Sequence, residues 1–296
     1  MRMFLHSLRL LSALLAAVLL AACKPSGPAA PPLQFGEATY DSTALHFALV
    51  PNRDCLPLYY AWRTGLFDSL GVKVQIASFA SQMDCDTALR SRHTDGGWAD
   101  TERLRHEPKA WPAFHTLWTG TAPWQLYVGS KLRLKGVKDL QGRTLAASRF
   151  SASDKVLDEA VEAGGLKRTQ VYRPQVNDLC LRARMLAGAQ IDGAVLTWPY
   201  TSLAAARGCK LLFTGQQSVQ RGAFVVKGKL WNRPEFQAQM ALVEKARHMA
   251  LDSMRLKGPV SYSLILQKDY GLPREVADTL RLARSSAGSR SATSRL

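Results

Sequence analysis

The chain has 296 residues, of which 47% are hydrophobic and 21% are charged, so it can bury at least one full core. It carries 39 Lys and Arg residues against 23 Asp and Glu residues, an excess that would suit nucleic acid, anionic lipid or a small anion. The basic residues are scattered, and no DNA- or RNA-reading motif accompanies them, which argues against a nucleic-acid partner. We therefore interpret the charge mainly as a solvated surface and keep a small anionic ligand as an alternative.

The N-terminus has the pattern of an export signal. Arg2 and Arg9 form a short basic region. The apolar run LLSALLAAVLLAA that follows is too short to span a bilayer as a mature helix. The sequence LAAC that ends at Cys23 is similar to a lipobox, in which the cysteine receives lipid and becomes the first mature residue. We expect a lipoprotein signal peptide over 1–22 and a Pro- and Ala-rich tether over 23–41, with a plain signal peptide or an uncleaved anchor as alternatives. This pattern predicts a periplasmic protein held to a cell membrane by lipid.

Short strands and helices alternate along the rest of the chain. In its first part, strands are predicted at 44–50, 72–79, 95–100 and 113–120, and helices at 57–67 and 84–92. Pro57 suits the first turn of the first helix, and Asp84 or Asp86 suits the N-cap of the second. A second α/β unit is predicted to begin after Pro123.

The second unit continues the alternation. Its predicted strands are 143–148, 170–176, 191–199 and 209–215. Three helices are predicted between and after them. The first is capped by Ser151 or Ser153 and ended by Gly164, the second covers 177–188 and is capped by Asn177 or Asp178, and the third covers 200–208. A further strand at 223–228 precedes a mostly helical stretch from about 233. This order predicts an α/β fold with parallel-type sheets flanked by helices on both faces. Residues 285–296 lack apolar periodicity and are predicted to be a disordered tail.

Three motifs occur in the same order as in a known protein family. They are PLYYAWRTGLF at 57–67, DLQG at 139–142 before a strand, and MLAGAQIDGA at 185–194 followed by Trp198-Pro199. Over residues 44–284 the chain resembles periplasmic solute-binding proteins of ABC importers, in the branch that handles taurine, alkanesulfonates, nitrate and thiamine-precursor pyrimidines. The segments RDCLP and QMDCDTA resemble a lipoprotein subgroup of that branch.

The resemblance implies a two-lobed, type II periplasmic-binding-protein fold that closes on a ligand. It implies that 42–118 and 218–284 form lobe one, that 124–213 form lobe two, and that crossovers near 119–123 and 214–218 are hinges. It also implies a monomer that delivers a small-molecule solute to an ABC permease and its ATPase, with no catalysis, cofactor or metal. An enzyme on the same bilobal fold, of the pyrimidine-precursor or menaquinone-pathway type, and a ligand sensor or receptor are the alternatives. Because the family carries more ordered chain after YGLP at 270–273, we expect either a divergent end or a chain that stops early, and a thinner lobe one.

Ligands of open parallel sheets bind beyond the carboxyl ends of the strands, where the chain enters the next helix. The predicted ligand-binding residues lie in or near such loops and are Asn52, Asp54, Tyr59, Gln82, Asp84, Trp98, Asp100, Trp124, Ser148, Ser151, Ser153, Asn177, Asp178, Trp198 and Tyr200. The serines precede a helix, whose N-terminal N–H groups suit an anionic or carbonyl group. The aspartates instead favour a cationic or donor-rich solute such as an aminopyrimidine, unless they only cap helices, which is the alternative for Asp84 and Asp178. Trp198 and Tyr200 are predicted to form an aromatic wall.

Cys55 and Cys85 follow strands that are neighbours in this fold. We expect them to form a disulfide or a packed thiol pair, with free thiols, a metal site and a nucleophile as successively weaker alternatives. Once Cys23 is lipidated, the remaining even count also permits a bridge between Cys180 and Cys209, which stays open. The sequence has no C-x-x-C motif, which argues against zinc.

Overall fold

The structure is a computed structural model that describes residues 41–216, 219 and 221–282. The predicted signal peptide, the predicted lipidation site at Cys23, nearly all of the tether and the tail at 285–296 lie outside these residues. Within the part that is described, no helix combines the length and the apolar character that a membrane span requires.

Five strands form the first sheet, in the order β2-β1-β3-β9-β4. Their bounds are β1 Leu45–Leu49, β2 Val74–Ser78, β3 Gly96–Asp100, β4 Phe114–Thr119 and β9 Gly222–Lys227. Strand β1 pairs in parallel with β2 and β3, whereas β9 lies antiparallel between β3 and β4. The chain reaches β9 directly from the second sheet, without a crossover helix, and this strand runs against its neighbours.

Four strands form the second sheet, in the order β6-β7-β5-β8. Their bounds are β5 Trp124–Val128, β6 Leu145–Ala146, β7 Gly193–Thr197 and β8 Lys210–Thr214. Strands β6 and β7 are parallel, and β5 is antiparallel to both β7 and β8. The α/β class is therefore confirmed, but both sheets are mixed rather than parallel throughout.

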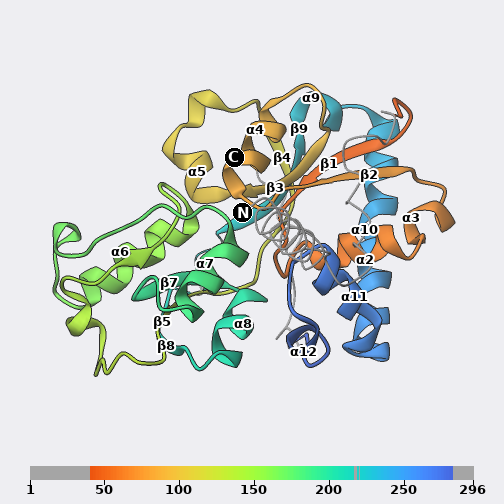
Figure 1. The fold of residues 1–296 in the computed structure, drawn as a ribbon. Helices are drawn as coiled ribbons and strands as arrows, with labels where there is room; N and C mark the ends of the chain where they lie inside the picture. The colour runs from red at the N-terminus through yellow and green to blue at the C-terminus, as the bar shows by residue number, and fades with distance from the viewer. Residues whose placement is uncertain (1–40, 217–218, 220, 283–296) are drawn as a thin grey trace, which may run out of the picture. The chain divides into compact units, whose positions relative to one another are not determined.

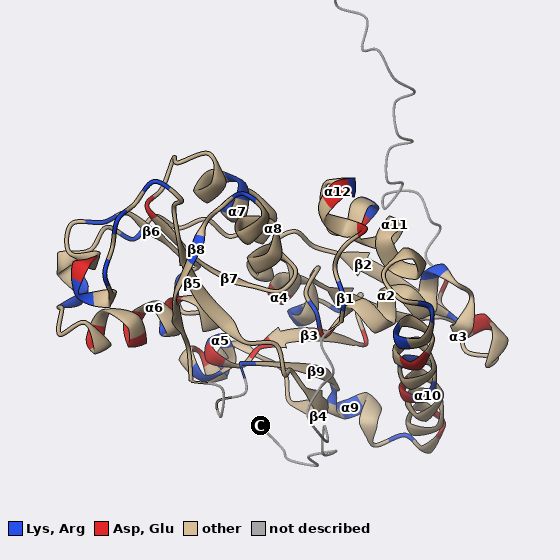
Figure 2. Ribbon diagram, turned by 90° about the horizontal axis from the view of Figure 1, so that it is seen from below, with Lys and Arg blue, Asp and Glu red and all other residues tan. Residues whose placement is uncertain are grey.

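Helices flank both sheets (Figure 1). Their bounds are α2 Leu56–Arg63, α3 Leu66–Ser69, α4 Gln82–Arg90, α5 Thr101–His106, α6 Ala152–Ala163, α7 Leu179–Ala187, α8 Tyr200–Ala206, α9 Gly228–Trp231, α10 Pro234–Lys257, α11 Val260–Lys268 and α12 Arg274–Ala277. The long helix α10 packs on α2 beside the first sheet, while α6, α7 and α8 contact strands of the second sheet. Lys and Arg residues are spread over several helices, including α7, α9 and α10, which agrees with a scattered positive charge (Figure 2).

Local sequence explains where the helices begin and end. The single helix predicted at 57–67 is two helices, α2 and α3, because Gly65 adopts a left-handed φ of 71° between them. Ser81, rather than Asp84 or Asp86, caps α4, since the Ser81 hydroxyl oxygen accepts the Asp84 N–H.

Two of the predicted caps in the second unit are confirmed. Ser151 caps α6 by accepting the Ser153 N–H, and Asp178 caps α7 by accepting the Leu181 N–H. The strand predicted at 170–176 is present only as isolated bridges from Thr144 to Tyr172 and from Ala147 to Gln175. Strand β5 was not predicted, because it follows β4 without an intervening helix.

One hydrophobic core extends from the first sheet into α8 and the C-terminal helices, and a smaller one lies between the second sheet and α6. The segment after α11 joins the two sides. The Tyr270 hydroxyl donates to the Asn52 carbonyl oxygen at 2.7 Å, and the Tyr200 hydroxyl donates to the Tyr270 carbonyl oxygen at 3.0 Å. Tyr270 therefore connects the loop after β1 with α8 through two buried hydrogen bonds.

Candidate ligand-binding site

A cavity of about 260 Å³ lies where strand ends of the two sheets face each other. Residues from the loops after β1 and β2, from the start of α4 and from β3 line it on one side, and residues from the 148–153 loop, α7 and β7 line it on the other. The two crossovers, 120–123 and 215–221, also contribute lining residues. This position is the one that the strand-end rule predicts for a ligand.

Ten of the fifteen predicted residues line this cavity. They are Asn52, Asp54, Gln82, Trp98, Asp100, Trp124, Ser148, Ser151, Ser153 and Asn177. Most of them follow or end a strand or lie at the start of a helix, whereas Trp98 lies within β3 and Trp124 begins β5. Their contact with a ligand stays a prediction.

The two predicted tyrosines lie in the core instead of the cavity. Tyr59 is fully buried, its hydroxyl is 2.6 Å from the Ser78 hydroxyl, and its ring meets Tyr270 edge-on at 5.4 Å. Tyr200 is also fully buried and uses its hydroxyl on the Tyr270 backbone. Both are corrected to structural residues, because hydrogen bonds inside the protein already occupy their polar groups.

The other three predicted residues also lie outside the cavity lining. Asp84 is exposed in the first turn of α4 and accepts a hydrogen bond from the Ser81 hydroxyl at 2.7 Å. Asp178 is the N-cap of α7, and Trp198 packs against the larger core. The aromatic wall of Trp198 and Tyr200 is therefore corrected, and Trp98 and Trp124 are the tryptophans that line the cavity.

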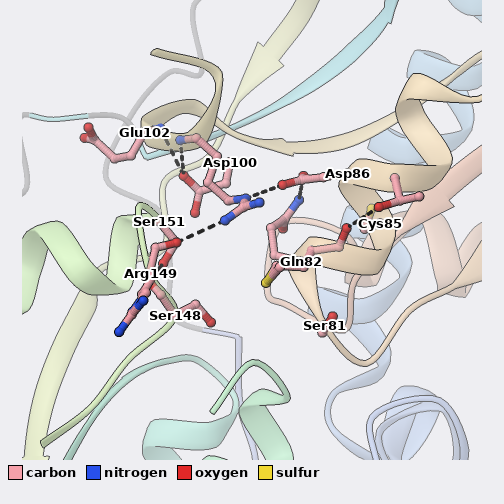
Figure 3. Close-up of polar contacts among 12 residues, drawn as sticks. Ser81, Gln82, Cys85, Asp86, Asp100, Glu102, Ser148, Arg149 and Ser151 are labelled. Atoms are coloured by element: carbon pink, nitrogen blue, oxygen red, sulfur yellow. Dashed lines mark hydrogen bonds and ion pairs between the residues drawn. The ribbon is translucent and has the colours of Figure 1, made fainter. Parts of the chain in front are cut away.

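Asp100 joins the two sides of the cavity. One carboxylate oxygen accepts the N–H groups of Glu102 and Arg103 as the N-cap of α5, and the other accepts the Ala152 N–H of α6 at 2.8 Å. Burial is the main cause that raises the pKa of Asp100 to about 7; the nearby charge of Asp86 adds to this shift, and the N–H groups of Ala152, Arg103 and Glu102 oppose it. Figure 3 shows this carboxylate between Glu102 and Ser151.

A second connection runs from α4 to the 148–153 loop. The Asp86 carboxylate, which is fully buried, accepts hydrogen bonds from Gln82 and from the Arg103 guanidinium (Figure 3). Arg103 also donates to the Arg149 carbonyl oxygen at 3.0 Å. Burial raises the pKa of Asp86, while the bonds from Gln82 and Arg103 oppose that shift. This chain of contacts spans the two sheets next to Asp100.

The serines of the 148–153 loop are buried and bonded to one another. The Ser153 hydroxyl oxygen accepts the Ser148 N–H at 2.9 Å, and the Ser151 hydroxyl donates to the Ser148 carbonyl oxygen at 2.7 Å. Ser148 in turn accepts a hydrogen bond from Arg182 at 2.8 Å. The cap interpretation is therefore correct for Ser151 alone, and the bonds among the three serines leave only part of their hydrogen-bonding capacity for a ligand.

Two arginines that line the cavity were not predicted. Arg182 is 1% exposed, and desolvation lowers its pKa to about 9. Its spacing with Leu179, Ala183 and Leu186 places it on the buried face of α7, a signal that the sequence contains. Arg221 precedes β9 and forms ion pairs with Glu102 and Glu159. No local pattern in the sequence indicates those partners, which come from α5 and α6.

Trp98 lies against Gly120 of the first crossover and against Gly222 at the start of β9. A Cβ atom at Gly222 would be 2.5 Å from the Trp98 ring, and one at Gly120 would be 2.9 Å from it. The two glycines are joined by a backbone hydrogen bond of 2.7 Å from the Gly120 N–H to the Gly222 carbonyl oxygen. Glycine is required at both positions, because any side chain would overlap the indole ring.

Asp54 fixes the start of the first crossover. Its carboxylate accepts the Thr121 N–H at 3.2 Å, the Thr121 hydroxyl at 3.3 Å and the Ala122 N–H at 3.4 Å. Burial raises the pKa of Asp54, which these hydrogen bonds and the charge of Arg53 only partly oppose. The loop after β1 and the 120–123 crossover are thus connected through one carboxylate that also lines the cavity.

The predicted disulfide between Cys55 and Cys85 is not formed in the structure. Both are buried free thiols, as is Cys209, and the partly buried Cys180 is free too. The Cys85 thiol donates to the Trp98 carbonyl oxygen at 3.4 Å, and burial raises the pKa of both Cys55 and Cys85 well above the ordinary value. The described residues hold no group of three or more His, Cys, Asp or Glu side chains that could bind a metal.

Comparison with solved structures identifies the fold. The chain aligns with the alkanesulfonate-binding protein of Xanthomonas axonopodis pv. citri bound to MOPS at 20% identity and a TM-score of 0.65, covering 80% of this chain and 83% of that one. It aligns with the periplasmic nitrate-binding protein of Synechocystis at 13% identity and a TM-score of 0.66, covering 79% and 68% of the two chains. It also aligns with a Prochlorococcus marinus protein in complex with methylphosphonate, at 13% identity and a TM-score of 0.54, covering 77% of this chain and 90% of that one. The predicted type II periplasmic-binding-protein fold is confirmed.

No curated protein matches the chain in sequence. The family described as "NMT1/THI5 like" matches residues 52–213, which is more than half of the 296 residues. The matched range begins at Asn52 in the cavity lining and continues to the end of β8, so it includes most of the lining residues. The chain belongs to the NMT1/THI5-like family.

Proposed function

We propose that the protein captures a small solute in the 260 Å³ cavity and delivers it to an ABC-type permease and its ATPase. The observation that carries this proposal is the cavity between the strand ends of two sheets, with hydrogen bonds from one side to the other at its rim. Its volume is just below the range of about 300 to 1,000 Å³ that is typical of drug-sized ligands, and so it favours a small solute. Sulfonate, nitrate and methylphosphonate appear as ligands in the names of proteins with this fold, which supports small-molecule binding.

The direct contacts across the cavity support closure around the solute. Asp100 to Ala152 and Arg103 to Arg149 each join an element of the first sheet to the 148–153 loop or α6. The chain passes from the first sheet to the second at 120–123 and returns between the end of β8 at Thr214 and the start of β9 at Gly222, so rotation about these two connections would open the cavity. We place the hinges there.

We propose binding without chemical conversion. The cysteines that could have acted as nucleophiles, Cys55 and Cys85, are buried, do not line the cavity and have raised pKa values, so little thiolate is present at neutral pH. The acidic groups that do line the cavity, Asp54 and Asp100, accept backbone N–H groups and act as caps or loop anchors.

Lipid attached to Cys23 would keep the monomeric protein at a membrane. The basic residues, the apolar run and LAAC at the N-terminus support this anchor. Cells expressing the full chain should yield a membrane-bound form whose mature N-terminus carries a lipid mass on Cys23, and Cys23→Ser should release the protein into the soluble periplasm. An unmodified, soluble wild-type protein would contradict the anchor.

Native mass spectrometry of protein isolated from the periplasm tests solute capture, followed by calorimetry on the released compound. We expect one unmodified small molecule per protein. Trp124→Ala should weaken its binding about tenfold or more, since an aromatic wall of the cavity is lost. Trp231→Ala is the matched control. It removes the α9 tryptophan that stacks on His115 of β4, away from the cavity lining, and should keep the affinity. Conversion of the compound by the protein would overturn the proposal.

A further inference from the structure

Four formally charged side chains line the cavity: Asp54, Asp100, Arg182 and Arg221. Their sum is zero, so the lining by itself suggests no preference for a charged solute. The partners of each side chain, however, decide how much of its charge reaches the cavity.

The charge of Arg221 is compensated inside the protein. Its guanidinium pairs with Glu102 of α5 at 3.2 Å and with Glu159 of α6. Arg221 is 6% exposed, so both ion pairs are shielded from solvent and are little weakened by salt. Glu102 is shared with Arg105, so Glu159 is the carboxylate that faces Arg221 alone, and it compensates the positive charge of Arg221 at the cavity.

Arg182 is largely committed to the protein as well. Its Nε donates to the Val176 carbonyl oxygen, Nη1 donates to the Val195 carbonyl oxygen, and Nη2 donates to the Val176 carbonyl oxygen and the Ser148 hydroxyl, at 2.5 to 2.8 Å. A guanidinium has five N–H groups, so these bonds leave one. Arg182 thus connects α7 to the strand ends of the second sheet and offers a solute a single donor.

The two carboxylates have no ion-pair partner among the residues that the structure describes. Asp54 accepts only long hydrogen bonds of 3.2 to 3.4 Å, and the charges of Arg53 and Arg247 act on it without forming a salt bridge. Asp100 accepts three backbone N–H groups and lies near the like charge of Asp86. These are the groups that would gain most from a positively charged partner.

The place where an oxyanion would be expected is already taken. An anion at this fold position would use the N–H groups at the start of α6. The Asp100 carboxylate accepts the Ala152 N–H at 2.8 Å, and the Ser151 hydroxyl oxygen accepts the Ser153 N–H. A sulfonate, nitrate or phosphonate would have to displace a carboxylate of the protein and lie beside it.

We propose that the cavity binds a small solute with a positively charged nitrogen group, an ammonium or an amidinium, which Asp54 and Asp100 hold beside the face of Trp98 or Trp124. This inference rests on the proposed solute capture and narrows it to organic cations. Tryptophan is the aromatic side chain that attracts cations most strongly, and both of these tryptophans line the cavity. The remaining N–H of Arg182 suits an uncharged acceptor, such as a carbonyl or hydroxyl oxygen, at the far end of the solute.

Four probes with one common ring test the charge preference: benzamidine, benzamide, benzoate and benzenesulfonate. Their dissociation constants are measured on the ligand-free protein at pH 8 by calorimetry and by tryptophan fluorescence. We expect benzamidine to bind at least tenfold more tightly than benzamide, and the two anions to bind more weakly still. Asp54→Asn and Asp100→Asn should each weaken benzamidine tenfold or more, which is the usual effect of losing one charge-assisted hydrogen bond. Asp252→Asn, an exposed aspartate of α10, makes the same chemical change away from the cavity and should leave binding intact.

The outcomes separate this inference from the proposed function. Tighter binding of benzoate or benzenesulfonate than of benzamidine would overturn the cation assignment and leave solute capture intact. Benzamidine affinity that neither Asp54→Asn nor Asp100→Asn changes would also overturn it, as would failure of benzamidine to bind. Absence of any bound small molecule in protein taken from the periplasm, together with no response to periplasmic extract, would overturn solute capture itself.

Discussion

The carboxylate of Asp100 and the backbone N–H of Ala152 meet across the cavity at 2.8 Å. The same carboxylate caps α5, so one side chain satisfies donors at the start of two helices from opposite sides of the cavity. The position that a bound anion would take in many proteins is thereby filled by a residue of the protein. Under the proposed function, ionisation of Asp100 would affect both the closure of the cavity and the solute that it accepts.

The stability of the protein should depend on pH through Asp100. Burial raises its pKa from 3.8 in the unfolded chain to about 7 in the folded one, so the folded state holds the proton more tightly. The contribution of Asp100 to the unfolding free energy is greatest below pH 4, falls as the pH rises from 4 to 7, and is constant above that range. Urea unfolding of the wild type and of Asp100→Asn between pH 5 and 8 should show this fall only in the wild type. Identical pH slopes in the two proteins would contradict the assignment.

Replacing Arg182 should destabilise the protein strongly. Arg182→Met keeps much of the volume but leaves the carbonyl oxygens of Val176 and Val195 without their buried donor, which costs about 1 to 3 kcal/mol for each unsatisfied group. Relief of the buried charge offsets part of this loss, and we expect a net decrease of about 3 kcal/mol in the free energy of unfolding.

Arg184→Met on the same helix is the control for that measurement. Arg184 is exposed and makes one hydrogen bond, to the Gly271 carbonyl oxygen at 2.8 Å. Its replacement should cost less than about 1 kcal/mol. Equal losses in the two variants, measured by urea unfolding, would show that Arg182 is no more important to the fold than a surface arginine.

Gly97 should tolerate no side chain. It has a φ of 156°, and a Cβ atom there would lie 2.0 Å from the Ala48 carbonyl oxygen in the neighbouring strand. Gly97→Ala should therefore lower the unfolding free energy by about 3 kcal/mol or more, because backbone atoms of β1 and β3 must separate. Gly136→Ala is the matched control, since a Cβ there has no neighbour within 4 Å, and its effect should stay within about 1 kcal/mol. A thermal melt of both variants distinguishes the two cases.

The cysteines should behave as protected thiols rather than as a bridge. Because burial raises the pKa of Cys55 and Cys85, both should react slowly with iodoacetamide in the folded protein and rapidly after denaturation in guanidinium. Mass mapping of the Cys23→Ser protein under non-reducing conditions should find both residues modified after denaturation. A peptide pair joined through Cys55 and Cys85 would restore the disulfide prediction.

The sequence predicted the α/β class and most elements, because alternating short strands and helices leave a strong periodic signal. The direction of the strands was harder to predict. β5 (Trp124–Val128) and β9 (Gly222–Lys227) enter their sheets straight from the other sheet, and only long-range pairing determines that they run antiparallel. Strand–helix alternation predicts parallel neighbours, so it does not indicate that β5 and β9 pair antiparallel.

The candidate site shows the same division between local and long-range information. Residues at strand ends, such as Asp54 and Asp100, were found because chain position alone directs them to the cavity. Tyr59 and Tyr200 were placed wrongly, because the rotation of a helix about its axis depends on what packs against it, here Tyr270 from the far end of the chain. Arg221 could not be found, since its partners come from two helices remote in sequence.

The contact of Trp98 with Gly120 and Gly222 gives the protein an internal optical reporter. Gly120 of the first crossover and Gly222, which follows the second, both lie against one indole ring, so the proposed rotation about the crossovers would change the surroundings of that ring. The emission maximum of Trp98 would therefore report opening and closing of the cavity without an attached dye, in both stopped-flow and equilibrium fluorescence measurements. In a protein variant whose other tryptophans are replaced by phenylalanine, only Trp98 would emit. Its fluorescence would then report solute binding through the movement at the hinges.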